Sequence, residues 1–573
     1  MGEPEPLRVR DALDKLVNQF ADPLSFFREL IQNALDAGSQ EVEVYCEFAA
    51  DAESGADASA GADDDAGVLV LRVEDWGEGM NREIIEKKLT RLFSSAKDGD
   101  RTKIGKFGIG FVSVFAIEPR AVCVDTSREG EHWRVIFNEQ REFSLLRREE
   151  PVDGTKIKIL KPMTRGEFKS FRERARETVE FWCKHVPGEI RFDDEVITRA
   201  LDLDAPCKTR VREEGAELVV AHAEGGKSFS GYYNSGLTLV EGHGEPGLEG
   251  IAFKASSPNI EHTLTRDDII RDRGFHRVVG QVKAAVFGPL CAEVFEMLEE
   301  HVVHAAHEGL TEYLYAAASW HVELERPLPD AVLGRNIALA PSGARVSLDS
   351  IMTALTSGEL LLAGAPSPVT DALEAKGTLV VLVPDDAKAA DEGEGAEADE
   401  DEAAVEEKPV EKFLSSLRSR VGGHTSWVGD RFCKPAPAVD EGEGARWREL
   451  QAATAQLMKD YGAKISEVRL GHFRYPESAI EDRVAISQRE SYALEPVTEV
   501  RVIGMSFFSR RRALVINADH PLVITLIELA RSEPEFAAYQ LAKLFFLGER
   551  LDAQLDAQLA KHTMERRWQR SKS

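Results

Sequence analysis

Three short stretches decide the fold of the N-terminal part of this 573-residue chain. They read Arg28-Glu-Leu-Ile-Gln-Asn-Ala-Leu-Asp-Ala-Gly38, Glu74-Asp-Trp-Gly-Glu-Gly-Met80 and Ile104-Gly-Lys-Phe-Gly-Ile-Gly-Phe111. The first has helical spacing that places Glu29, Asn33 and Asp36 on one face, because residues i, i+4 and i+7 line up along an α-helix. A carboxylate and an amide are therefore predicted to point to one place.

The second and third stretches are rich in glycine. The second follows the apolar run Val68–Val73, which we expect to be a strand, and its glycines let backbone approach a flat ligand. The third leads into the apolar segment Phe111–Ile117 and is suited to presenting backbone N–H groups to phosphate at a helix start. Together with the first stretch they predict a pocket for ATP.

At these three stretches the chain resembles the Bergerat-fold ATPases, the superfamily of gyrase, 90-kDa heat-shock chaperones, histidine kinases and MutL-type repair proteins. Within it the chain looks most like the 90-kDa heat-shock chaperones. Either glycine motif alone is common in loops, so the resemblance rests on all three in order. It implies ATP and Mg²⁺ as cofactors and hydrolysis of ATP to ADP and phosphate.

The resemblance assigns roles to individual residues. Glu29 is the expected catalytic base, with a surface salt-bridge glutamate as the alternative. Asn33 would hold Mg²⁺ through its amide oxygen, since this cation prefers oxygen ligands. Asp75 would accept the exocyclic amine of adenine, because a carboxylate is a pure acceptor; the alternative is a turn aspartate. The other residues expected around ATP are Gly79, Met80, Lys97, Gly105, Gly108, Gly110, Phe111 and Thr155, although strands favour threonine anyway.

A fourth string, Leu264-Thr-Arg-Asp-Asp268, precedes a predicted helix as the family's catalytic-loop string does. By this resemblance Arg266 is the expected arginine finger, which would stabilise charge on the γ-phosphate and couple hydrolysis to the docking of two domains. The alternative is a surface ion pair with Asp267 or Asp268.

The chain departs from the family at three places. The segment between Lys97 and Gly105 is shorter than the usual chaperone lid, so the lid is expected to close differently or not at all. Lys88 stands where an asparagine is common. Ile270 replaces a glutamine that often follows the finger arginine.

Charge is distributed unevenly along the chain. The formal net charge is −29, of which residues 51–65 contribute −6 and residues 385–407 contribute −11. Both stretches are too poor in apolar side chains to offset the entropy lost on ordering, so we expect a hairpin insertion and a disordered linker. The remaining acidity disfavours nucleic acid as a partner, because binding it needs a basic surface.

Six scattered cysteines indicate neither a zinc site nor a disulfide framework. The N-terminus lacks the apolar core of a signal peptide, and no apolar run approaches 18 residues. These features predict a cytoplasmic protein with no membrane contact.

The predicted fold class is an α+β multidomain protein. We expect an N-terminal Bergerat-fold α/β sandwich, a middle α/β domain that resembles the ribosomal protein S5 domain 2-like fold, and a C-terminal α+β dimerisation domain. The expected bounds are 1–190 for the ATP-binding domain, 191–384 for the middle domain (191–300 the catalytic-loop segment, 301–384 a small subdomain), 385–412 for the linker and 413–573 for the C-terminal domain.

Several elements can be predicted. The helical regions are Leu13–Ala37, a helix from Arg82, and Val278–His301; the strands include Glu41–Glu47, Arg120–Thr126, Glu131–Phe137, Thr155–Leu160 and Thr378–Val383. In the C-terminal part, Leu514–Val523 resembles the family's strand that is followed by a helix at Asn-x-x-His-Pro, with Pro521 in the first turn. A helical apolar stripe, Phe536–Leu547, is either a core stripe or a dimer seam.

Three functions remain open. The first is an ATP-driven chaperone that is a homodimer and clamps client proteins by N-terminal closure. The second is a Bergerat ATPase switch of another role, MutL-like or defence-type, which the acidic balance and Arg266 disfavour. The third is a nucleotide-binding scaffold with little turnover, which the short lid leaves open.

Overall fold

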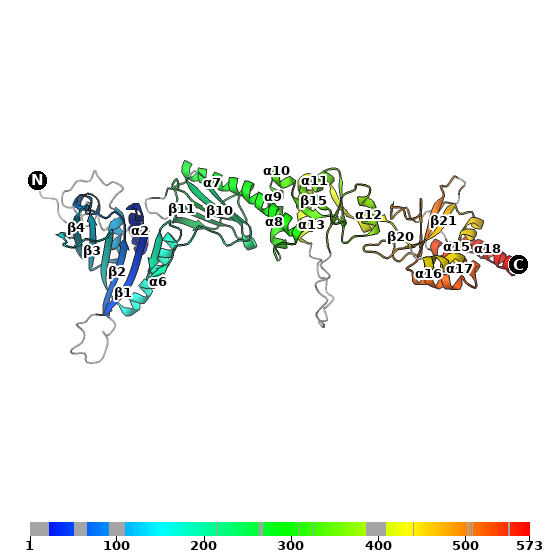
Figure 1. The fold of residues 1–573 in the computed structure, drawn as a ribbon, viewed down its shortest axis with the longest axis horizontal. Coiled ribbons are helices and arrows are strands. Elements are labelled where there is room, and N and C mark those ends of the chain that lie inside the picture. The colour runs from blue at the N-terminus through cyan, green and yellow to red at the C-terminus, as the bar shows by residue number, and fades with distance from the viewer. Residues whose placement is uncertain are drawn as a thin grey trace, which may run out of the picture. The chain divides into compact units, whose positions relative to one another are not determined.

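The computed structural model describes residues 22–572, apart from 51–65, 91–108, 214, 262, 264–267, 308, 325, 385–407, 439–440, 501–502, 505, 507 and 548–550. The chain divides after Leu290 into two compact units. Each unit is described separately below, with the element labels of Figure 1.

The first unit begins with a mixed eight-stranded sheet in the order β5-β4-β3-β6-β2-β1-β7-β8. All neighbours are antiparallel except β1 and β7. The strands are β1 (Glu41–Ala50), β2 (Ala66–Asp75), β3 (Ala121–Arg128), β4 (Glu131–Asn138), β5 (Phe143–Arg147), β6 (Thr155–Thr164), β7 (Glu189–Phe192) and β8 (Glu195–Val196). The mixed sheet of the predicted N-terminal sandwich is thereby confirmed.

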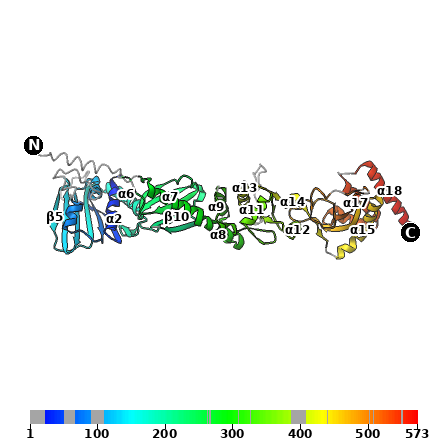
Figure 2. The same ribbon diagram turned by 90° about the horizontal axis from the view of Figure 1, so that it is seen from above.

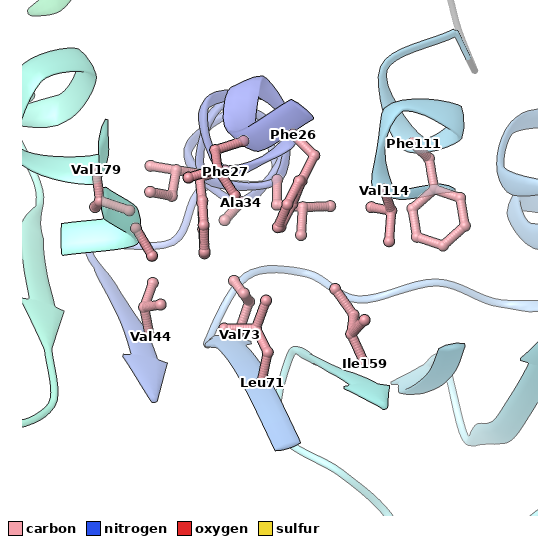
Figure 3. Packing of buried hydrophobic residues seen from close by; sticks show 14 of the residues in the cluster. Phe26, Phe27, Ala34, Val44, Leu71, Val73, Phe111, Val114, Ile159 and Val179 are labelled. Atoms are coloured by element: carbon pink, nitrogen blue, oxygen red, sulfur yellow. The ribbon is translucent and has the colours of Figure 1, made fainter. Parts of the chain in front are cut away.

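Helices cover one face of this sheet. They are α2 (Phe26–Asp36), α5 (Ile109–Val112), the 3₁₀ turn η3 (Ser113–Ile117) and α6 (Arg165–Cys183). Figure 3 shows Phe26, Phe27 and Ala34 of α2 facing strand residues that include Leu71 and Val73. Alternate residues of β1 and β2 are buried, as expected for strands with one face in the core. This core fixes α2 on the sheet.

The start of α2 differs from the predicted helical region Leu13–Ala37. A 3₁₀ turn, η1 (Pro23–Ser25), precedes α2, and residues before 22 lie outside the described part. Asp22 caps this turn by accepting a hydrogen bond from the backbone N–H of Leu24 at 3.0 Å. Proline is tolerated in the first turn of a helix but disrupts its interior, so the described α-helix begins after Pro23.

A second sheet completes the first unit. Its order is β12-β11-β13-β10-β9, with bounds β9 (Lys208–Glu213), β10 (Ala216–His222), β11 (Phe229–Asn234), β12 (Leu237–Gly242) and β13 (Ile251–Ser256). Helix α7 (Arg273–Ala285) packs against β10 and β13, and both views show it beside this sheet (Figures 1 and 2). The π-helical turn η5 (Val286–Leu290), which contains Pro289, follows α7.

The long helix predicted from Val278 begins five residues earlier, at Arg273. Asp272 caps it by accepting a hydrogen bond from the backbone N–H of Phe275 at 2.9 Å. Among described residues, Arg273–His304 is the one helical stretch long and apolar enough to cross a membrane, and half of its apolar window is buried in the protein. A helix that packs in a protein core can have the same length and apolar composition.

The second unit begins with helices around two small sheets. Its elements are α8 (Cys291–His304), α9 (Thr311–Glu323), α10 (Asp330–Leu333), β14 (Asn336–Leu339), β15 (Arg345–Ser347), α11 (Leu348–Thr356), β16 (Glu359–Ala363), α12 (Pro368–Glu374), β17 (Val380–Leu382), α13 (Pro409–Val421) and β18 (His424–Trp427). Strands β17, β16 and β18 form one parallel sheet.

The strand order of this parallel sheet corrects the predicted bounds of the small subdomain, 301–384, and of the acidic linker, 385–412. Strand β17 precedes the acidic residues 385–407, whereas β18 follows them and pairs with the same neighbour, β16. Helix α13 packs on α9, where Ser416 donates a hydrogen bond to Glu323 at 2.7 Å. Residues 409–427 therefore complete the small subdomain that was predicted to end at 384.

The rest of the second unit contains a four-stranded sheet, β20-β21-β24-β22, packed with helices, and a two-stranded sheet, β19-β23. The elements are α14 (Val428–Arg431), β19 (Phe432–Cys433), β20 (Ala436–Pro437), α15 (Glu441–Tyr461), β21 (Ile465–His472), β22 (Ala485–Gln488), β23 (Glu495–Pro496), β24 (Arg512–Asn517), α16 (Pro521–Leu529), α17 (Pro534–Phe546) and α18 (Ala553–Arg570). The predicted strand and helix around Asn517–Pro521 are confirmed, with Pro521 in the first turn.

The apolar stripe on α17 has mainly the first of its two predicted roles, that of a core stripe. Leu541 is fully buried in the unit's core, with Tyr539, Leu544 and Phe545 partly buried against it. Phe536 and Leu547 are exposed. Most of the stripe is therefore core.

Candidate nucleotide site

Glu29 lies on the buried face of α2, toward the start of α5. Its side chain is 4% exposed, which is rare for a carboxylate. A Cβ added at Gly110 would overlap the Glu29 carboxylate, so only glycine fits there without displacing it. The structure thus brings together two predicted site residues that are 81 positions apart in the sequence.

Asn33 and Asp36 follow Glu29 at positions i+4 and i+7 of α2; unlike Glu29, which is buried, both are exposed. Partial burial raises the pKa of Asp36. The amide oxygen of Asn33 is the kind of donor that a hard divalent cation accepts, and the exposed side chain leaves it accessible. Among the described residues, no group of three or more His, Cys, Asp and Glu side chains could hold a metal ion.

Asp75 ends β2, and its backbone pairs with Thr155 at the start of β6. Burial raises the pKa of Asp75, while hydrogen bonds from the backbone N–H groups of Gly77 and Thr155 to its carboxylate partly oppose the shift. The distance from Gly77 N to Asp75 Oδ1 is 2.9 Å. A half-buried carboxylate with few protein donors retains acceptor capacity for a ligand.

Hydrogen bonds hold the loop after Asp75 on two sides. Trp76 donates its backbone N–H to Ser39 Oγ at 2.9 Å, and Glu78 donates its backbone N–H to the carbonyl of Ala37 at 2.9 Å. On the other side, Met80 donates its backbone N–H to Thr126 Oγ1 at 2.8 Å. The loop is therefore held between the end of α2 and strand β3.

Gly79 is the most constrained residue of this loop. Its φ of +65° lies in the left-handed region that favours glycine, and an added Cβ would overlap the carbonyl oxygen of Ser127. Thr126 and Thr155, paired across β3 and β6, have hydroxyl oxygens 3.2 Å apart beneath this point. Thr155, Asp75 and Gly79 thus gather at one end of the sheet.

Phe111 and Met80 contribute differently from what the sequence suggested. Phe111 is 5% exposed, and its ring packs 5.5 Å from that of Phe137, so its side chain belongs to the core. Met80 is half-buried and packs on the same core.

Four predicted residues, Lys97, Gly105, Gly108 and Arg266, lie outside the described residues. Others that shape the site were missed in the sequence. Ser39 and Thr126 hold the Asp75–Met80 loop through hydroxyl groups, and only strand register could have placed them there. Their burial, at 2% and 0% exposed, agrees with a supporting role.

Residues 25–178 match the family described as "Histidine kinase-, DNA gyrase B-, and HSP90-like ATPase". All the described site residues lie within this range. The matched part of the chain is therefore an ATPase domain of that family.

Similar proteins of known name agree with this family match. Chaperone protein HtpG of Roseobacter denitrificans is 26% identical over 201 residues, covering 33% of this chain and 32% of the relative. HtpG of Anaplasma phagocytophilum is 33% identical over 186 residues, covering 30% and 29%. DNA mismatch repair protein MutL of Opitutus terrae is 32% identical over 131 residues, covering 20% and 18%. The predicted resemblance to Bergerat-fold ATPases and their chaperone branch is confirmed, although the chain spans only about a third of the length of the HtpG relatives it matches.

Proposed function

We propose that this chain is an ATP-dependent chaperone of the 90-kDa heat-shock type. The observation that carries the proposal is the meeting of Glu29 and Gly110 above a sheet whose end holds Asp75 and Thr155, in a domain that matches the ATPase family. The similarity to HtpG chaperones supports the choice of a chaperone over another ATPase.

In the proposed reaction Glu29 accepts the proton of the water that attacks the γ-phosphate. Its burial keeps it away from competing bulk water, and the carboxylate lies against the start of α5, where backbone N–H groups favour phosphate. Asn33 would hold Mg²⁺, which when bound spreads the charge of the phosphates. Arg266 supplies the second positive charge in this proposal.

Asp75 selects the base. Its half-buried carboxylate can accept a hydrogen bond from the exocyclic amine of adenine, whereas guanine presents an oxygen at that position. Gly79 and Met80 lie next to Asp75 in the anchored loop and would line the base.

The proposal extends to clients and to assembly. Large apolar side chains are exposed on α16, α17 and α18 and just after α17, namely Leu522, Ile524, Phe536, Leu547, Met564 and Trp568. Exposed apolar surface of this kind suits protein partners. We propose that residues 413–573 hold two copies together as a homodimer, and that nucleotide-dependent closure acts on client proteins in the cytoplasm.

Two measurements test this function. The first is ATP turnover and nucleotide affinity for the wild type, Glu29→Ala and Arg266→Ala. Turnover lost with binding retained in both variants supports the ATPase, whereas binding without turnover in the wild type supports the scaffold alternative. The second is ATP-dependent refolding of denatured luciferase; a protein that hydrolyses ATP without aiding refolding favours a MutL-like switch.

A further inference from the structure

The C-terminal turn of α6 carries a buried group of charged residues. Lys184 and His185 follow the helix directly and are 8% and 7% exposed. Two buried ionisable groups in succession are unusual, because a charge loses its hydration on burial unless it is paired. Their partners lie on the second sheet.

Lys184 pairs with Glu241 of β12, with Nζ 2.8 Å from Oε1 and 2.9 Å from Oε2. Tyr233 of β11 donates its hydroxyl to the same carboxylate. Although burial opposes ionisation of Glu241, the hydrogen bonds from Lys184 and Tyr233 hold its pKa below the usual value. The carboxyl group of Glu241 is therefore ionised in the folded protein.

His185 joins the second sheet through β13. Lys254 lies with Nζ 3.0 Å from His185 Nε2, and His185 Nδ1 lies 3.1 Å from the carbonyl oxygen of Arg199. Since an ammonium can only donate, Nε2 accepts and Nδ1 donates, so the imidazole is neutral. Burial, with nearby Lys254, lowers the pKa of His185 to about 4, in agreement with that assignment.

Backbone contacts reinforce these side chains. Thr238 of β12 donates its hydroxyl to the carbonyl of Phe181 at 2.6 Å. A Cβ at Gly236 would overlap the carbonyl of His185, so the two chains approach closely. We call Lys184, His185, Tyr233, Glu241 and Lys254 the junction cluster.

The same turn of α6 also contacts α2. The guanidinium of Arg28, the residue before Glu29, lies 4.6 Å from the centroid of the Trp182 ring, and Arg28 is 3% exposed. Trp182 is two residues before Lys184. One helical turn thus connects the helix of the proposed base with the second sheet.

We propose that the junction cluster docks the second sheet on the ATPase domain before nucleotide binds, and that Lys184 and Glu241 are positioning residues for ATP hydrolysis. This inference rests on the proposed function. The chain runs from β13 to α7 through the segment that includes Arg266, so docking β13 restrains where that segment starts. The pair acts through this placement and does not touch ATP.

The test compares Lys184→Met and Glu241→Gln with the wild type as full chains. Both variants keep the side-chain volume and remove one charge. We expect turnover to fall about tenfold, with the Kd for a non-hydrolysable ATP analogue within about twofold of the wild type, as for loss of an interaction made in the transition state. Hydrogen exchange of residues 229–256 should become faster without nucleotide.

Two controls separate positioning from general damage. Arg176→Met removes an exposed ion pair of the same helix with Glu195 and should leave turnover and exchange unchanged. Lys184→Arg retains the cation and should keep turnover within about threefold of the wild type, since it can still pair with Glu241.

The outcomes are distinct. Faster exchange with full turnover in Lys184→Met and Glu241→Gln would show a purely structural cluster and overturn the positioning role. Unchanged exchange in both would overturn docking itself. A wild type that binds no ATP refutes the proposed function and with it the positioning role, while the exchange of the variants still decides whether the cluster docks the sheet.

Discussion

The carboxylate of Glu29 occupies the space that a β-carbon at Gly110 would need. A methyl group at position 110 cannot be accommodated unless the carboxylate moves. The identity of a glycine in a loop is thus linked to the geometry of a helix residue 81 positions earlier.

Gly110→Ala should therefore impair hydrolysis more than binding. Because a displacement of about 1 Å in a catalytic group can cost on the order of a hundredfold in rate, we expect turnover to fall at least tenfold. Phosphate-release kinetics and calorimetric titration measure the two quantities. Gly280→Ala, on the open side of α7, is the matched control and should lose nothing; equal losses in both variants would disprove the contact's role.

Glu29→Gln tests the proposed base with almost no change in shape. Removing a general base typically lowers a rate by about 10²–10⁴-fold, so turnover should fall in that range while ATP still binds. Single-turnover phosphate release is the measurement. Turnover near the wild-type level would assign the base to another residue.

Asp75→Asn should separate stability from binding. Burial raises the pKa of Asp75, so the folded protein holds this proton more tightly than the unfolded chain does. The stability that this group contributes is complete below the unfolded pKa and is lost as the pH rises through the folded pKa. An asparagine side chain does not ionise, so Asp75→Asn loses no stability in this way as the pH rises. In thermal unfolding at neutral pH the variant should be at least as stable as the wild type.

The same variant should bind ATP about ten- to a hundredfold more weakly, the loss expected for one hydrogen bond to a charged group. Glu74→Gln, one residue earlier in an ion pair with Lys156 at 2.6 Å, is the control and should bind normally. Normal ATP affinity in Asp75→Asn would remove Asp75 from the base site.

Gly79→Ala should destabilise the ATPase domain. The backbone strain of about 1–2 kcal/mol for φ above zero is combined with an overlap with the carbonyl of Ser127. Gly130→Ala, with a φ of +78° but nothing within 4 Å, has the strain alone. Calorimetry should show a lower unfolding temperature for Gly79→Ala than for Gly130→Ala; equal temperatures would mean that the loop relaxes freely.

The sequence revealed the elements whose apolar pattern is strong. The apolar run in β2 and the helical spacing of Glu29, Asn33 and Asp36 in α2 were sufficient to predict both. Strand β5 was missed because it is only five residues long and none of them is fully buried; half-buried Phe143 and Leu145 alternate with exposed Ser144 and Leu146. The predicted starts of α2 and α7 also differed from the structure, because capping and first-turn residues determine where a helix begins. Pro23 precedes α2 and Asp272 caps α7, and apolar spacing reveals neither boundary.

Helix α6, missed in the sequence, had a readable signal. Thr164 and Glu167 form a capping box, and Phe168, Phe171, Ala175 and Val179 follow at helical spacing. The partners of Lys184 and His185 could not have been predicted, because Glu241 and Lys254 are more than 50 residues away and only the packing of two sheets brings them together. Lone charged residues in a sequence look the same whether exposed or buried.

The three parallel strands on either side of the acidic residues have a practical consequence. Strands β16 and β17 come before residues 385–407 and β18 comes after, yet they share one sheet. The acidic stretch is thus an insertion within a subdomain, and the chain can be split there into two complementary fragments. Halves expressed separately, divided between Gly395 and Ala396, should reassemble through this sheet and copurify, which makes the subdomain a natural seam for split-protein reporters and segmental labelling.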